Sequence, residues 1–179
     1  MFIRSDRLFL RPGWPEDSEE LLLLIGDEAI IRNMAFLPWP FVAENAREYI
    51  SRPRERLLPH LLATLPASDG AKLIGSTGFG RVGRDVELGY WIARDFWGQG
   101  YATEAVRAML GLARALGHCR LVASHFTDNP ASGRVLEKAG FRRTGEAQMR
   151  HSMVRRGAAL ALGYEIELMK CDPTVMLAA

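Results

Sequence analysis

The spacing of apolar and polar positions changes several times along the first half of the chain. A strand is predicted over residues 2–12, where Leu8 and Leu10 alternate with polar positions before Pro12. Helices are predicted over residues 15–27 and 43–57, the second of them cut or kinked at Pro53. The segment FLPWPF at residues 36–41 contains two prolines and therefore forms a loop.

The second half alternates between strand and helix patterns. Strands are predicted over residues 61–67, 72–82 and 86–93, the first two joined by a turn at residues 68–70. Apolar residues recur at helical spacing from Ala102 to Leu116, and a strand follows over residues 120–126. The segment NPASGRVLEKAG predicts a short helix capped by Asn129 and stopped by Gly140, before strands over residues 141–149 and 160–170.

This order of elements predicts the fold class. It indicates an α+β (mixed α/β) domain built on one sheet. The strand–helix–strand unit from Val86 to Phe126 is expected to form a right-handed parallel crossover. Neither a linker nor an internal repeat is visible, so residues 1–179 are expected to form a single domain.

Composition narrows the function classes. With 23 basic and 21 acidic residues among 179, the formal net charge of +2 gives no indication of nucleic-acid binding. Two cysteines form neither a disulfide framework nor a zinc pattern, and the histidines lack metal-ligand spacing, so we expect free thiols and no metal. Charged residues interrupt the N-terminal segment, and no run approaches the ~20 apolar residues that span a bilayer. We expect a cytoplasmic protein without a membrane partner.

The turn WGQG at residues 97–100 precedes the helix that begins near Ala102. Glycine permits positive φ and a close backbone approach, and a helix start offers unpaired N–H groups, so the turn is a candidate phosphate site. A purely structural loop is the alternative. A P-loop is excluded because Gly-Lys-Ser/Thr is absent. A dinucleotide fingerprint lacks both its third glycine and the acidic residue some 20 positions later, which argues against a nucleotide-binding oxidoreductase.

Two separated segments carry a family resemblance. ELGYWIARDFWGQGYATEA resembles the acetyl-coenzyme A binding core of the GNAT superfamily of N-acetyltransferases, and DNPASGRVLEKAGF resembles its second hallmark segment. The opening DRLFLRP, and LPWPF followed by AREYI, are most similar to the Rim-type branch, the ribosomal-protein N-terminal acetyltransferases and their relatives. The resemblance implies a GNAT fold, with a mostly antiparallel sheet and a parallel crossover that binds acetyl-CoA.

The resemblance also implies a cofactor site. The superfamily pattern Gln/Arg-x-x-Gly-x-Gly/Ala falls on residues 97–102; Trp97 departs from it, as is familiar in the Rim-type branch, and Gly100 and Ala102 match. By resemblance the helix-start N–H groups hold the pyrophosphate, and strand and helix residues hold the pantetheine. The implied cofactor-binding residues are Tyr90, Trp91, Ile92, Gly98, Gln99, Gly100, Tyr101, Ala102, Thr103, Asn129 and Ser132.

Catalytic candidates follow from what amine acetylation needs: a base, an oxyanion donor and a proton for the thiolate. Glu87 lies where several members of the superfamily place a catalytic glutamate, although a structural carboxylate is the alternative. Rim-type relatives place a catalytic glutamate near the position of His151, so His151 is the second candidate base. Glu146 is the third. Ser132 stands at the position of the serine thought to assist the thiolate, and the backbone N–H near Ile92 is the expected oxyanion donor.

The resemblance implies an acetyltransferase that moves an acetyl group from acetyl-CoA to a primary amine, and the absence of cysteine from the two motifs favours direct attack. The acceptor is a protein N-terminus or a small-molecule amine, and a homodimer is possible. Residues 36–58 show no acidic cluster, which disfavours polyamines and aminoglycosides. Five arginines between residues 142 and 156 are interpreted as a solvated face rather than a site for an acidic acceptor. A non-catalytic acetyl-CoA sensor on the same fold is the alternative function.

Overall fold

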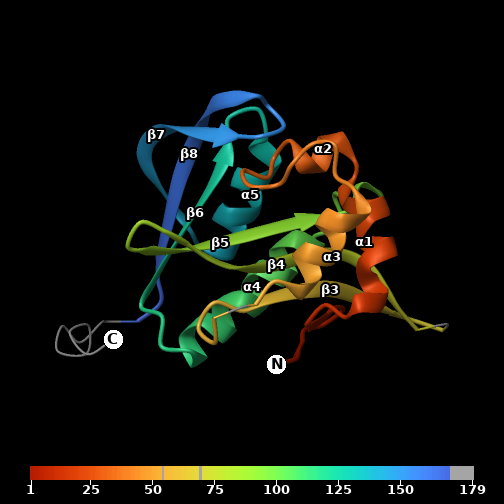
Figure 1. Ribbon diagram of the computed structural model, residues 1–179. Helices are drawn as coiled ribbons and strands as arrows, with labels where there is room; N and C mark the ends of the chain where they lie inside the picture. Colours follow the sequence, from red (N-terminus) through yellow and green to blue (C-terminus); the bar gives the residue numbers. More distant parts are fainter. Residues whose placement is uncertain (54, 69, 170–179) are drawn as a thin grey trace.

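A single mixed sheet organises the chain. The computed structural model describes residues 1–53, 55–68 and 70–169 (Figure 1). The described strands lie in the order β1-β2-β3-β4-β5-β6-β8-β7, and every neighbouring pair is antiparallel except β5 and β6. The predicted fold class and its parallel crossover are therefore confirmed. The strands are β1 (Ile3–Arg4), β2 (Phe9–Arg11), β3 (His60–Ala67), β4 (Gly70–Val82), β5 (Asp85–Ile92), β6 (Arg120–Phe126), β7 (Arg142–Ser152) and β8 (Gly157–Glu167).

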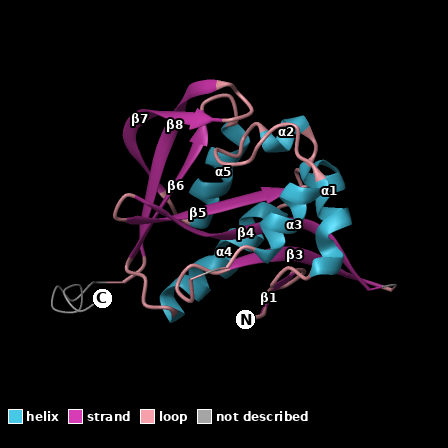
Figure 2. Cartoon of the chain, viewed as in Figure 1, coloured by secondary structure: helices cyan, strands magenta, loops and turns pink. Residues whose placement is uncertain are grey.

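Helices cover both faces of the sheet (Figure 2). Because side chains alternate along a strand, Leu61 and Ile74 pack into one apolar cluster with the long helix after β5, while Leu62 and Leu73 pack into a second cluster with the N-terminal helices. Each face is thus sealed by its own layer of helices. The helices are η1 (Pro15–Asp17), α1 (Ser18–Ile25), α2 (Glu28–Ile31), α3 (Ala43–Ser51), η2 (Arg94–Phe96), α4 (Tyr101–Ala115) and α5 (Pro130–Ala139).

The structure differs from the pattern at the N-terminal strand and at α2, and it shows the predicted break near Pro53. The predicted N-terminal strand is a hairpin of two short strands, because the chain turns where the backbone N–H of Ser5 bonds the carbonyl of Leu8 at 3.0 Å. The predicted helix over residues 43–57 ends at Ser51, ahead of Pro53. The short helix α2 was not predicted; Asp27 caps it by accepting from the N–H of Ala29 at 2.8 Å. The last predicted strand, residues 160–170, is β8 over Gly157–Glu167. Residues 54, 69 and 170 of the predicted helix, turn and last strand lie outside the described residues.

The expectation of free thiols is wrong for Cys119, which is disulfide-bonded. Cys171 lies outside the described residues. The carbonyl of Cys119 accepts a hydrogen bond from the N–H of Leu168 at 2.7 Å, so the start of β6 lies beside the chain that leaves β8. The spacing of the two cysteines in the sequence does not indicate that Cys119 lies next to the segment after β8. Among the helices that the structure describes, none combines the length and apolar character needed to cross a bilayer.

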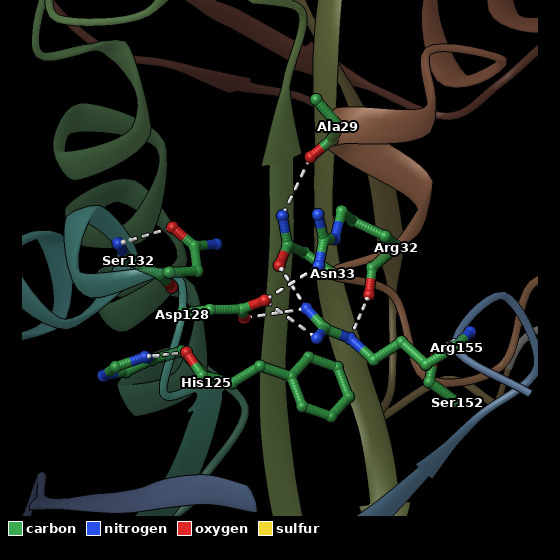
Figure 3. Close-up of polar contacts among 10 residues, drawn as sticks. Ala29, Arg32, Asn33, His125, Asp128, Ser132, Ser152 and Arg155 are labelled. Atoms are coloured by element: carbon green, nitrogen blue, oxygen red, sulfur yellow. Dashed lines mark hydrogen bonds and ion pairs between the residues drawn. The ribbon is translucent and has the colours of Figure 1, made fainter. Parts of the chain in front are cut away.

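A cluster that we call the Arg155 clamp ties three segments together: Arg155 of the β7–β8 turn, Arg32 and Asn33 after α2, and Asp128 after β6 (Figure 3). Arg155 donates to both carboxylate oxygens of Asp128 at 2.8 and 2.9 Å, and to the carbonyl of Arg32 at 2.9 Å. Its guanidinium also lies 4.3 Å from the centre of the Phe126 ring. The clamp fixes the β7–β8 turn against the segment that contains FLPWPF.

The Asp128→Asn variant tests the clamp through pH. Hydrogen bonding from Arg155 holds the pKa of Asp128 below its usual range, and the charges of Arg155 and Arg32 add to the effect. The stabilisation is therefore complete above the unfolded pKa of about 3.9 and is lost as pH falls through the lower folded pKa. We expect Asp128→Asn to lower the free energy of unfolding by about 1 kcal/mol at pH 7, since the carboxylate is partly exposed. Urea titrations at pH 7, 5 and 3 should show this difference shrinking below pH 4; a difference independent of pH would contradict it.

Candidate active site

The sheet splits between its two parallel strands. The register of β5 and β6 contains one pair, Glu87 opposite Val122, and the strands then diverge toward Ile92. In Figure 1 strands β6 and β8 turn away from the direction of β3 to β5. A cavity of about 840 Å³ occupies the split. It is lined by residues from both faces of β5, so it connects the layer of α4 and α5 with the layer of α1 to α3.

One end of the cavity reaches the glycine turn before α4. Gly98 and Gly100 have φ of 74° and 84°, the left-handed region that glycine adopts without strain. The first hydrogen bond into α4 runs from the N–H of Glu104 to the carbonyl of Gly100 at 3.1 Å. The N–H groups of residues 101–103 therefore precede the helical ladder, at the positive end of the helix dipole. The turn has the geometry of an anion site, and both glycines line the cavity.

Arg7, to which the sequence pattern assigned no role, supports this turn from outside. Its guanidinium pairs with Glu104 at 2.7 Å, donates to the carbonyl of Gln99 at 3.1 Å, and lies 4.3 Å from the centre of the Tyr101 ring. The indole N–H of Trp97 donates to the carbonyl of Ile92 at 2.6 Å and joins the turn to the end of β5. The turn is therefore held by contacts from β1–β2 and β5.

Tyr90 bridges the split from β5 to α5. Its hydroxyl lies 2.7 Å from the Ser132 hydroxyl and donates to the Ser132 carbonyl at 3.0 Å. Burial raises the pKa of Tyr90, more than the hydrogen bond to Ser132 lowers it, so the phenol stays protonated at neutral pH. Asn129 caps α5 as predicted, its side chain accepting from the Ser132 N–H at 3.4 Å. Tyr90, Asn129 and Ser132 all line the cavity.

Glu87 faces the other layer and is already paired. Arg150 of β7 binds both of its carboxylate oxygens, through Nη1 and through Nη2 at 3.0 Å. The Ser124 hydroxyl donates to Glu87 at 3.0 Å and also contacts Nη1 of Arg150. The side chains of Glu87 and Arg150 are 16% and 20% exposed, and all three residues line the cavity. The ring of Phe36 lies 6.0 Å from the guanidinium carbon of Arg150.

On β4 and β5, the positions next to Glu87 on its face of the sheet are glycines. Gly80 and Gly89 lie on β4 and β5 on the face of Glu87, and a Cβ at either would meet no heavy atom within 4 Å. Past these glycines, Tyr49 forms a network that the sequence did not indicate. Its hydroxyl lies 2.8 Å from Nε2 of His60 and 2.7 Å from the hydroxyl of Ser76. It also accepts from the indole of Trp91 at 3.2 Å.

Most of the remaining predicted site residues line the cavity, and Gln99 does not. Trp91, Ile92, Tyr101, Ala102 and Thr103 line the cavity, as do four residues of FLPWPF: Phe36, Leu37, Pro38 and Phe41. Gln99 is exposed at the turn, and its side chain donates to the carbonyl of Asp95 at 3.0 Å.

Two neighbouring residues of β7, Arg150 and His151, point to opposite faces of the sheet. His151 is exposed, while its neighbour Arg150 faces the cavity, because successive side chains on a strand point to opposite faces. The side chain of Glu146 lies outside the described residues. The arginine cluster is a solvated face at Arg142, Arg143 and Arg156, but that interpretation is wrong for Arg150 and for Arg155, which is 14% exposed.

Comparison with known proteins supports the family resemblance seen in the sequence. Residues 7–142 match the family model described as acetyltransferase (GNAT) domain. The chain is 38% identical over 150 residues to the uncharacterised N-acetyltransferase YoaA of Bacillus subtilis, covering 80% of this chain and 84% of YoaA.

Two solved structures are similar in fold. One is the microcin C7 self immunity acetyltransferase MccE in complex with acetyl-CoA and AMP, with a TM-score of 0.74, 20% identity, and 91% and 93% of the two chains covered. The other is the ribosomal L7/L12 alpha-N-protein acetyltransferase RimL with coenzyme A, with a TM-score of 0.75, 19% identity, and 96% and 100% covered. The family match and the split sheet lead to one conclusion: the chain belongs to the GNAT acetyltransferase family.

Proposed function

We propose that this protein transfers the acetyl group of acetyl-CoA to a primary amine. The observation that carries the proposal is the cavity itself, which runs from the left-handed glycine turn of α4, through the split beside β5, to the carboxylate of Glu87. Family membership and the acetyl-CoA complex of MccE support the choice of cofactor. We infer that residues 1–179 act as a single catalytic domain, because one sheet carries all these features.

The residues around the turn fit the cofactor. The N–H groups of residues 99–103 would receive the pyrophosphate at the positive end of α4. Strand residues 90–92 border the split, where β5 has lost its neighbour β6. The main-chain groups of Trp91 are directed to β4, so those of Tyr90 and Ile92 are the ones placed to pair with pantetheine amides as an added strand would. The carbonyl of Ile92 already accepts from Trp97. Asn129 and Ser132 border the same channel from α5. When bound there, acetyl-CoA supplies the activated acetyl group.

The chemistry is then divided between the two faces of β5. Glu87 removes the proton from the attacking amine, directly or through a water molecule, and the N–H near Ile92 stabilises the oxyanion. Ser132, whose hydroxyl is held by protonated Tyr90, assists the departing thiolate. We propose direct attack by the amine, because no cysteine lines the cavity among the residues described. His151 is exposed and receives no role.

The acceptor is proposed to be a protein N-terminus or a small amine. The likeness to RimL, described as an alpha-N-protein acetyltransferase, supports the first and the Rim-type branch. A sensor that binds acetyl-CoA without turnover is the second candidate, favoured by one observation: Arg150 already occupies both oxygens of Glu87. A thiol-release assay against amines and N-terminal peptides separates the two, since a sensor binds the cofactor and releases no thiol.

The Gly100→Ala variant tests the cofactor turn. A side chain at φ 84° is strained by about 1–2 kcal/mol, and relief of that strain would move the N–H groups that precede the helix. We expect acetyl-CoA affinity, measured by calorimetry, to fall about 10-fold or more. Gly83, which also has positive φ in a hairpin turn away from the cavity, provides the control: Gly83→Ala carries similar strain and should leave the affinity unchanged. Equal effects of the two substitutions would contradict the assignment.

The Glu87→Gln variant tests the base. The amide keeps the shape of the carboxylate but accepts no proton at neutral pH, so kcat should fall about 100- to 10,000-fold while acetyl-CoA affinity is retained. Steady-state thiol release and calorimetry measure the two quantities. His151→Ala is the matched control and should keep wild-type kcat. If Glu87→Gln retains kcat within a few-fold, Glu87 is not the base.

A further inference from the structure

Arg150 is only partly used by its partners. Its Nη1 and Nη2 atoms bind the two oxygens of Glu87, and Nη1 also contacts Ser124. A guanidinium carries five N–H donors in a planar fork. Among residues 1–53, 55–68 and 70–169, no acceptor bonds its Nε, and Nη2 makes one of its two possible bonds. The edge formed by Nε and Nη2 therefore has donors without an acceptor among the described residues, in a side chain that is 80% covered and lines the cavity.

The Nε–Nη2 edge has a preferred partner. Two parallel N–H donors match the two oxygens of a carboxylate, and this bidentate pairing is why arginine is favoured at carboxylate sites. The ring of Phe36 lies on the same side of the cavity, 6.0 Å from the guanidinium carbon. The other arginine and lysine residues that line the cavity lie elsewhere: Arg134 and Lys138 on α5, across the sheet, and Arg52 directly after α3, paired with Glu48 at 3.2 Å.

The proposed chemistry requires the pair between Arg150 and Glu87 to loosen. An acceptor amine arrives as an ammonium ion and is attracted to Glu87, where it competes with Arg150 for the same two oxygens. An acceptor with only an ammonium group would leave the guanidinium largely covered and without a counter-charge, which is costly. An acceptor that also carries a carboxylate supplies that counter-charge, so each of the four charges keeps a partner throughout the exchange.

We propose that the acceptor is an amine that carries a carboxylate, which the Nε–Nη2 edge of Arg150 binds while the amine approaches Glu87. Arg150 is thus a specificity-determining residue of the acceptor site. This inference rests on the proposed acetyltransferase function and on the use of Glu87 as its base. The carboxylate can belong to a free amino acid or to an acidic side chain near a peptide N-terminus, because the edge recognises the same planar group in both.

The test compares acceptors with and without the carboxylate, and Arg150 variants measure each pair again so that differences in amine basicity cancel. Peptides with glutamate or glutamine at the second position form one pair, and alanine with alanine amide forms the other, so the two pairs distinguish peptide from small-molecule acceptors. We expect wild-type kcat/KM for thiol release to favour the carboxylate member of at least one pair about 10- to 100-fold, the effect of a charge-assisted bidentate contact. Arg150→Gln should reduce that ratio to within about 3-fold.

Controls separate recognition from damage to the site. Arg150→Gln lowers kcat for both members of a pair if Glu87 is disturbed, but only lost recognition changes their ratio. Arg150→Lys, which keeps the charge without the fork, should give an intermediate ratio, and exposed Arg143→Gln on the same strand should keep the wild-type ratio. Acetyl-CoA affinity by calorimetry confirms that each variant is folded.

The outcomes distinguish this inference from the function on which it rests. Equal use of both members of each pair by the wild-type protein, or an unchanged ratio in Arg150→Gln, overturns the carboxylate assignment and leaves the acetyltransferase standing. Thiol release from no acceptor at all overturns both.

Discussion

The loss of pairing between β5 and β6 is the constraint on which the rest of this structure depends. The two strands share one pair of residues at Glu87 and Val122 and then separate, because β5 belongs to the sheet half built with β3 and β4 while β6 pairs with β8. A sheet interrupted in this way exposes main-chain groups that need partners. Tyr90 joins β5 to Ser132 of α5 on one side of the gap, and the gap becomes the channel of the proposed site.

The source of charge differs between the two ends of that channel. At the turn before α4 the positive field comes from main-chain N–H groups and the helix dipole, while the charge of Arg7 beside the turn is paired with Glu104. At the other end a carboxylate and a guanidinium balance one another under partial burial. Such a pair is costly to break unless new partners replace the old ones, and this requirement links the basicity of Glu87 to the chemistry of the acceptor.

Contacts outside the cavity determine its walls. The Arg155 clamp joins the β7–β8 turn, the segment after α2 and the segment after β6, and thereby sets the position of β7, from which Arg150 reaches Glu87. Arg7 does the same for the α4 turn from the first hairpin. These residues touch neither the proposed thioester nor the proposed amine, yet each fixes an element that does. Arg7 lies 97 residues from Glu104 in the sequence, and Arg155 lies 27 residues from Asp128 and 123 from Arg32.

The sequence by itself determined the elements whose signals are local: the period of the apolar residues in α4, the cap and stop of α5, the two glycines that need positive φ, and the family motifs. It also placed Glu87 on the strand that borders the split. Only the tertiary structure decided which side chains meet there. Strand alternation and the register of β7 against β8 turn Arg150 inward and His151 outward, and a shift of one residue would reverse them. The network of Tyr49, His60 and Ser76 joins three separate elements, and no short-range pattern records such a meeting.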